Sequence, residues 1–176
     1  MAVKKLELYV HIPFCEKKCG YCDFLSFRAD DMEKKAYVIQ LMEEIRVQGQ
    51  NYTDYNVSSV FIGGGTPTAL NGIWIVEIMN TIRESFMVET DAEISIECNP
   101  GTLSTSKIMH LKKAGINRIS FGLQSSIEDE LIELGRIHTY KDFLNSFQLA
   151  REYGFTNINV DLMSGLPLQS TDSYKT

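Results

Sequence analysis

The sequence repeats one unit five times: a short apolar or β-branched run, a polar or glycine-rich loop, and a stretch with helical periodicity. The strand-like runs occupy residues 6–12, 58–62, 92–97, 117–121 and 157–162. Strands that alternate with helices form a mostly parallel sheet with right-handed crossovers. The alternation therefore predicts an α/β fold, namely a partial (β/α) barrel like a TIM barrel, with its first five strand–helix units present.

The segments between these runs carry helix signals. Residues 38–45 place apolar side chains at the i, i+3, i+4, i+7 spacing of a helix with one buried face. Further helices are expected at about residues 75–86, 104–114 and 141–153. The last two end at Gly115 and Gly154, as a left-handed helix cap requires.

We expect residues 1–176 to form one domain, because no low-complexity linker divides them. Residues 165–171 read as a loop that enters another helix. Five parallel strands also leave an edge that such folds normally pair or cover. We therefore expect the N-terminal part of a longer barrel, with the remaining barrel and a C-terminal domain absent.

Charge and composition exclude several classes of protein. A net charge of −6 argues against broad nucleic-acid binding, which needs a basic face. No run approaches the about 18 apolar residues of a membrane span, and Glu7 and His11 interrupt the N-terminal apolar run. Four cysteines are too few for a disulfide scaffold at this length. We expect a cytoplasmic protein that has no membrane span and binds no nucleic acid.

Three cysteines form the sharpest motif, C-x-x-x-C-x-x-C, directly after the first strand-like run. Cys15, Cys19 and Cys22 fall in one loop, so their thiolates can converge on one metal centre. A four-iron four-sulfur (4Fe-4S) cluster normally takes four protein thiolates, so three of them leave one iron open to a substrate or cofactor. Two alternatives stay open: a zinc site completed by His11, and cysteines that are incidental or redox-active.

A triple glycine follows the second strand-like run. Gly63, Gly64 and Gly65 precede Thr66, without the Lys-Ser or Lys-Thr pair of a phosphate loop and without the spacing of a dinucleotide fingerprint. Such a segment allows either close approach of a ligand to the backbone or a tight strand–helix turn.

Polar side chains close the later strand-like runs. Glu97 ends the third, Gln124 follows the fourth, and Asp161 lies in the fifth. All strand carboxyl ends of a parallel barrel open on one face, which holds the active site. Arg136 lies in a nearby loop, and a guanidinium can grip a carboxylate with two N–H groups. We expect Glu97, Gln124 and Asp161 to line one mouth together with the cysteine loop and the glycines.

These motifs, in this order, resemble the radical S-adenosylmethionine (radical SAM) superfamily. More closely, six segments are similar to the family of oxygen-independent coproporphyrinogen III oxidases and heme chaperones: LYVHIPFC (8–15), CDF (22–24), GGGTPT (63–68), IECNP (96–100), SFGLQS (120–125) and GRIHT (135–139). The resemblance implies a 4Fe-4S cluster on Cys15, Cys19 and Cys22, with S-adenosyl-L-methionine on its open iron. It also implies one-electron cleavage of the sulfonium to a 5′-deoxyadenosyl radical.

The resemblance further implies which residues contact the cofactor. The implied contacts are with the methionine ammonium (Gly64, Gly65, Thr66, Glu97), the carboxylate (Arg136), the ribose hydroxyls (Gln124, Asp161) and the cofactor near the cluster loop (Tyr9, Tyr21). No catalytic residue is assigned.

Two departures place the chain nearer to the heme chaperones than to the oxidases. The oxidases carry a further cysteine two residues after the third, where this chain has Phe24, and a longer N-terminal extension. The resemblance therefore implies a protein that delivers heme to acceptor proteins and takes electrons from a reductant. Heme binding is implied by kinship alone and falls on no residue of this chain. The alternatives are oxidative decarboxylation of coproporphyrinogen III, a tetrapyrrole, and a zinc-stabilised barrel without radical chemistry.

Overall fold

A five-stranded parallel sheet forms the centre of the molecule. The computed structural model describes residues 4–175. The strands are β1 (Lys4–Ile12), β2 (Tyr55–Gly64), β3 (Met87–Cys98), β4 (Arg118–Gln124) and β5 (Asn157–Leu162). Their order in the sheet is their order in the chain, and every neighbouring pair is parallel. The predicted α/β fold with five strand–helix units is confirmed.

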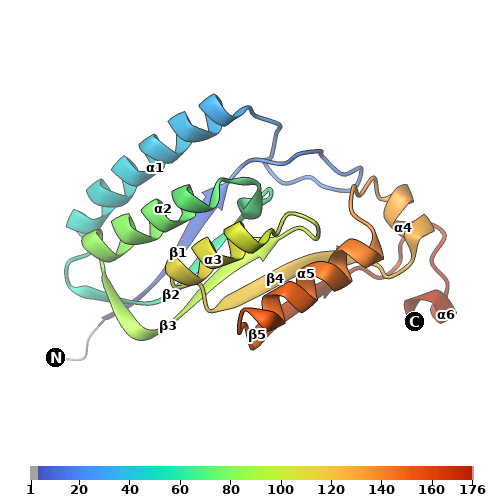
Figure 1. Ribbon diagram of the computed structural model, residues 1–176. Helices are drawn as coiled ribbons and strands as arrows, with labels where there is room; N and C mark the ends of the chain where they lie inside the picture. The colour runs from blue at the N-terminus through green and yellow to red at the C-terminus, as the bar shows by residue number, and fades with distance from the viewer. Residues whose placement is uncertain (1–3, 176) are drawn as a thin grey trace.

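Figure 1 shows the long helices gathered on one face of this sheet. The helical segments are α1 (Asp31–Asn51), the 3₁₀ helix η1 (Pro67–Ala69), α2 (Gly72–Ser85), α3 (Thr105–Lys113), α4 (Glu128–Glu133), α5 (Tyr140–Glu152) and α6 (Thr171–Tyr174). The sequence analysis did not anticipate α4, because six residues are too few for a periodicity to show. Within residues 4–175, no helix combines the length and the apolar character needed to cross a bilayer.

Local signals fix where the helices begin and end. Helix α1 begins earlier than its periodicity suggested, because Asp30 accepts hydrogen bonds from the N–H groups of Met32 and Glu33. The Glu33 carboxylate accepts the Asp30 N–H in return, which completes a capping box. Gly115 and Gly154 follow α3 and α5 with φ of +77° and +79°, so the predicted left-handed caps are confirmed.

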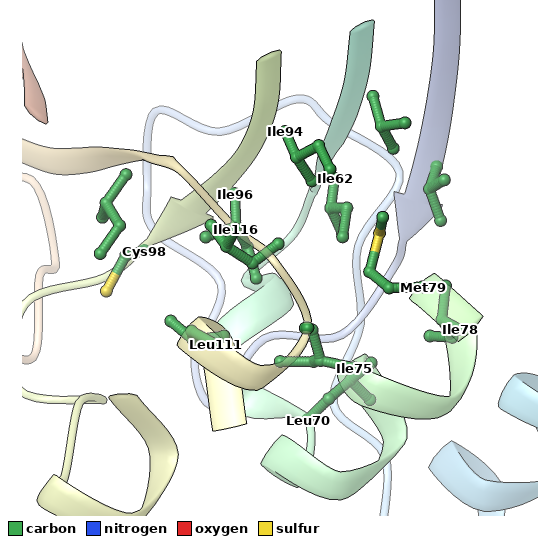
Figure 2. Close-up of a cluster of buried hydrophobic side chains, with 14 of the residues drawn as sticks. Ile62, Leu70, Ile75, Ile78, Met79, Ile94, Ile96, Cys98, Leu111 and Ile116 are labelled. Atoms are coloured by element: carbon green, nitrogen blue, oxygen red, sulfur yellow. The ribbon is translucent and has the colours of Figure 1, made fainter. Parts of the chain in front are cut away.

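Each strand places its apolar side chains on the face that the helices cover. The buried strand residues include Val10, Ile12, Val57, Val60, Ile62, Ile94, Ile96, Ile119 and Phe121. Figure 2 shows strand residues such as Ile62 and Ile96 facing Ile75 and Met79 of α2 and Leu111 of α3. Each such side chain contributes about 1.5–3 kcal/mol when fully buried, so the core between sheet and helices dominates the stability of the fold.

The opposite face of the sheet is mainly polar from β3 to β5. Its side chains are Glu93, Ser95, Glu97, Arg118, Ser120, Asn157, Asn159 and Asp161. They bond to one another: the Ser120 hydroxyl and the Asn159 amide both donate to the Asp161 carboxylate, at 3.0 and 2.7 Å. The interior of a TIM barrel is usually filled with Val, Ile and Leu. This polar face is therefore suited to a polar ligand.

Candidate functional site

A cavity of about 330 Å³ opens at the carboxyl ends of the strands. This volume lies at the lower end of the range for small-molecule sites. The residues proposed for the site that line it are Cys15, Cys19, Tyr21, Cys22, Gly64, Gly65, Thr66, Glu97, Gln124, Arg136 and Asp161. Parallel topology brings these distant positions together, because every strand delivers its last residues to the same edge.

Backbone pairing beyond the ends of β1 and β2 positions Cys15. The Gly65 N–H donates to the Ile12 carbonyl at 2.8 Å, and the Thr66 N–H donates to the Phe14 carbonyl at 2.7 Å. A Cβ on Gly65 would lie 2.7 Å from the Phe14 oxygen and 2.9 Å from the Cys15 sulfur. Only glycine allows this close approach, so Gly65 lets the Cys15 sulfur pack against the glycine-rich segment.

Gly64 serves the site through its conformation and its N–H group. Its φ is +123°, and a Cβ there would lie 2.8 Å from the His11 ring. Gly63 and Gly64 end strand β2 and do not form a separate turn. The Gly64 N–H donates to the Glu97 carboxylate at 3.0 Å, so the glycine segment fixes an acidic group at the end of β3.

The second and third cysteines follow a turn held against α4. The Gly20 N–H donates to the Leu134 carbonyl at 3.1 Å, and the Cys22 N–H donates to the Cys19 carbonyl at 3.2 Å. Figure 1 shows the segment after β1 extending toward α4. The unanticipated helix α4 therefore anchors the cysteine loop.

Arg136 ties this loop to the strand ends. Its Nη1 lies 3.6 Å from the Cys19 sulfur and 3.5 Å from the Tyr21 hydroxyl. Its Nη2 donates to the Asn99 side-chain oxygen at 2.8 Å and to the Gly122 carbonyl at 2.7 Å. Arg136 Nε is buried and has no hydrogen-bond partner within residues 4–175. A two-pronged grip on a carboxylate would require Arg136 to release one of these partners.

Burial and neighbouring charges perturb the acidic group of the cavity. Burial raises the pKa of Glu97 above the ordinary carboxyl value, the Gly64 N–H offsets part of this rise, and the negative charge of Asp161 adds to it. Burial also raises the pKa of Tyr21, although the neighbouring Arg136 charge opposes this. A cation placed beside Glu97 would recover the cost of burying its charge.

Tyr9 lies on the open face of β1, outside the lining of this cavity. Its ring stacks on Phe61, and its hydroxyl is 2.9 Å from Nδ1 of His11. The other ring nitrogen of His11, Nε2, lies 3.1 Å from the Leu25 carbonyl oxygen. Burial and the nearby Glu97 charge raise the pKa of Tyr9.

This arrangement weighs against the zinc alternative. Both nitrogens of His11 have protein partners, so neither is free to complete a site. Without His11, the three cysteines are one ligand short of the four that a structural zinc site takes.

Asn99 is the main site residue that the sequence analysis did not single out. Its side chain bonds both Thr66, at 3.1 Å, and Arg136, at 2.8 Å. The available signal was its place two residues after Glu97, at the end of a strand. Gln124 was predicted from its position, but its left-handed φ of +72° was not, and such strain is common at functional sites.

Comparison with known proteins agrees with this geometry. The family model of the radical SAM superfamily matches residues 9–175. The chain belongs to the radical SAM superfamily. It is similar to the heme chaperone HemW of Bacillus subtilis, with 41% identity over 163 residues. It is also similar to the oxygen-independent coproporphyrinogen III oxidase of Salmonella typhimurium, with 38% identity over 172 residues.

The structural neighbours of this radical SAM chain give the same result. The coproporphyrinogen III oxidase HemN from Escherichia coli, a radical SAM enzyme, superposes with a TM-score of 0.91 and 36% identity over 98% of this chain. The chain spans less than half of these relatives: 43% of the B. subtilis protein, 38% of the S. typhimurium protein and 40% of the HemN chain.

Membership of the radical SAM superfamily implies a 4Fe-4S cluster and S-adenosyl-L-methionine, and the residues present fit both groups. Cys15, Cys19 and Cys22 are half-buried side chains on the wall of one cavity. Three thiolates leave one iron without a protein ligand. The half-buried Glu97 carboxylate suits an ammonium group, and Arg136, which lines the same cavity, has one buried donor, Nε, without a partner among the described residues.

Proposed function

We propose that Cys15, Cys19 and Cys22 hold a 4Fe-4S cluster, and that the adjoining cavity binds S-adenosyl-L-methionine. The observation that carries this proposal is that the three cysteines share one cavity with a carboxylate, a guanidinium and two polar strand ends. The bound cluster would supply the electron that cleaves the sulfonium carbon–sulfur bond of the cofactor.

The side chains of the cavity would bind and orient the cofactor. Glu97 would pair with its ammonium group, and the raised pKa of this carboxyl would fall again once the cation is bound. Asp161 would accept a ribose hydroxyl, because Ser120 and Asn159 already hold its two oxygens in place. Gln124 would reach the same hydroxyls from the end of β4, and Arg136 would meet the carboxylate through Nε.

We further propose that the protein acts as a heme chaperone similar to HemW, which delivers heme to acceptor proteins and receives electrons from a reductant. Two residues after Cys22, where the oxidases carry a further cysteine, Phe24 lies 70% exposed on the wall of the same cavity. A side chain without a sulfur ligand at this place supports the chaperone over the oxidase. The second candidate remains oxidative decarboxylation of coproporphyrinogen III, since an oxidase is also a 38% identical relative.

Anaerobic reconstitution followed by electron paramagnetic resonance tests the cofactor site. We expect a reduced 4Fe-4S signal that changes when S-adenosyl-L-methionine is added. The Cys15→Ala variant should lose iron and sulfide, whereas Cys98→Ala should keep them, because Cys98 is buried and does not line the cavity. Full iron content in Cys15→Ala would contradict the proposed ligand set.

Two assays on the whole protein separate the chaperone from the oxidase. A heme chaperone should bind heme in an absorption titration and pass it to an acceptor protein. Incubation with coproporphyrinogen III and S-adenosyl-L-methionine should then yield no protoporphyrinogen IX. Turnover to that product would replace the chaperone with the oxidase.

A further inference from the structure

A continuous series of side-chain contacts joins the sulfurs of two cysteines through Asn99. The Cys15 sulfur lies 3.5 Å from the Thr66 hydroxyl oxygen, and that oxygen lies 3.1 Å from Asn99 Nδ2. Asn99 Oδ1 lies 2.8 Å from Arg136 Nη2, and Arg136 Nη1 lies 3.6 Å from the Cys19 sulfur. Asn99 is the midpoint of this series.

Chemistry fixes the direction of every hydrogen bond in the series. Arginine only donates, so the atom of Asn99 that faces Arg136 has to be its oxygen. Asn99 Nδ2 therefore faces Thr66 and donates to the hydroxyl oxygen. With Cys15 bound to the proposed cluster as a thiolate, its sulfur can only accept, so the Thr66 hydroxyl donates to it. Both ends of the series thus direct a donor at a sulfur.

We propose that Asn99 is a positioning residue that sets the reduction potential of the cluster by directing these two donors at the sulfurs of Cys15 and Cys19. The inference rests on the proposed cluster site. Hydrogen bonds to the sulfurs are among the factors that set the potential of an iron–sulfur cluster. They stabilise the reduced cluster more, because it carries more negative charge, so their loss lowers the potential.

The backbone at Asn99 is held independently of its side chain. The Asn99 carbonyl accepts the Thr102 N–H at 3.2 Å and the Thr102 hydroxyl at 2.6 Å. Truncation of the side chain therefore leaves the end of β3 in place while it removes the support of Thr66 and Arg136. The half-buried position of Asn99 also limits the cavity that such a truncation creates.

The test is a redox titration of the reconstituted whole protein with dithionite, monitored by electron paramagnetic resonance. In Asn99→Ala, we expect the ratio of reduced to oxidised cluster at a fixed potential to fall about tenfold, which corresponds to a midpoint lowered by about 59 mV for one electron. Thr66→Val should lower the midpoint in the same direction, and Thr66→Ser should restore the parent value because it keeps the hydroxyl.

Asn117→Ala is the matched control. The Asn117 side chain also makes two hydrogen bonds to β3, to the Ala92 carbonyl and from the Ile94 N–H, both at 2.8 Å. Ile94 lies five residues before Asn99, about 16 Å along an extended strand. This variant should lose stability and leave the midpoint unchanged.

The double variant Asn99→Ala/Thr66→Val distinguishes positioning from general damage. If Asn99 acts partly through Thr66, the two shifts are less than additive. An unchanged midpoint in cluster-bearing Asn99→Ala, or an equal shift in Asn117→Ala, would overturn this inference alone. A parent protein that takes up no iron would overturn the inference together with the proposed cluster site.

Discussion

Substitution of Gly65 by alanine tests how the glycine-rich segment holds the cysteine loop. Gly65 has no left-handed φ, so the cost of a side chain there is steric. The added Cβ would lie 2.7 Å from the Phe14 oxygen, 3.0 Å from the Phe14 carbonyl carbon and 2.9 Å from the Cys15 sulfur. Two of these atoms belong to the backbone, which cannot rotate away as a side chain can.

The expected loss of unfolding free energy follows from the contacts that the glycine-rich segment loses in Gly65→Ala. Separation of the two strand ends breaks the Gly65–Ile12 and Thr66–Phe14 backbone hydrogen bonds. Each is worth about 1 kcal/mol, and overpacking adds about 1–3 kcal/mol. We therefore expect Gly65→Ala to lose about 3–5 kcal/mol of unfolding free energy in urea denaturation followed by circular dichroism. We also expect it to take up less iron, because Cys15 moves.

Gly20→Ala is the control from the same loop. Gly20 also lacks a left-handed φ, and its added Cβ would meet the Leu134 oxygen at an ordinary 3.9 Å. We expect its unfolding free energy to stay within about 1 kcal/mol of the parent value. Equal losses in Gly65→Ala and Gly20→Ala would refute the steric argument.

Two further predictions concern buried ionisable groups. Burial and the Arg136 charge lower the pKa of His138 to about 4. A histidine in the unfolded chain has a pKa near 6.5, so between pH 6.5 and 4 the unfolded chain binds a proton that the native protein does not. The free energy of unfolding should therefore fall by up to about 3 kcal/mol as the pH drops through this range. Urea denaturation of His138→Leu should show a smaller loss, and a slope as steep as the parent's would contradict the assignment. Burial raises the pKa of the Cys98 thiol to about 11. Iodoacetamide at pH 8 should therefore label Cys15, Cys19 and Cys22 of the cluster-free protein and leave Cys98 unlabelled. Equal labelling of all four cysteines in peptide mass spectrometry would contradict this prediction.

The residues at the strand ends could be predicted from the sequence because parallel topology leaves little choice about where they meet. Once the strands are recognised, Glu97 and Asp161 have to lie at the edge that carries the cysteine loop. Their identification needed only the alternation of apolar runs with helices and a polar residue at the end of each run.

Contacts between side chains distant in the sequence could not be predicted in this way. The link from Asn99 to Arg136 spans 37 residues, and no spacing rule connects them. The same holds for Glu130, which is buried at 2% exposure and accepts hydrogen bonds from Ser125, Gln169 and Ser173. The sequence analysis did not single out Glu130, and its composition gives no signal for burial, because an acidic residue among other charges is normally solvated.

Substitutions on the two faces of the sheet have different effects on stability, and this affects how such a protein can evolve. A substitution of Ile96 or Met79 disturbs the packed side of the molecule, where a cavity costs about 2–5 kcal/mol. Ser120 and Asp161 face the other side, where they line the cavity, and contribute little to that core. Replacement of these residues can therefore reshape what the cavity accepts while the scaffold stays folded. A sheet of this kind can acquire a new ligand specificity with little loss of stability, because the side chains that contact the ligand and those that form the core lie on opposite faces of the same strands.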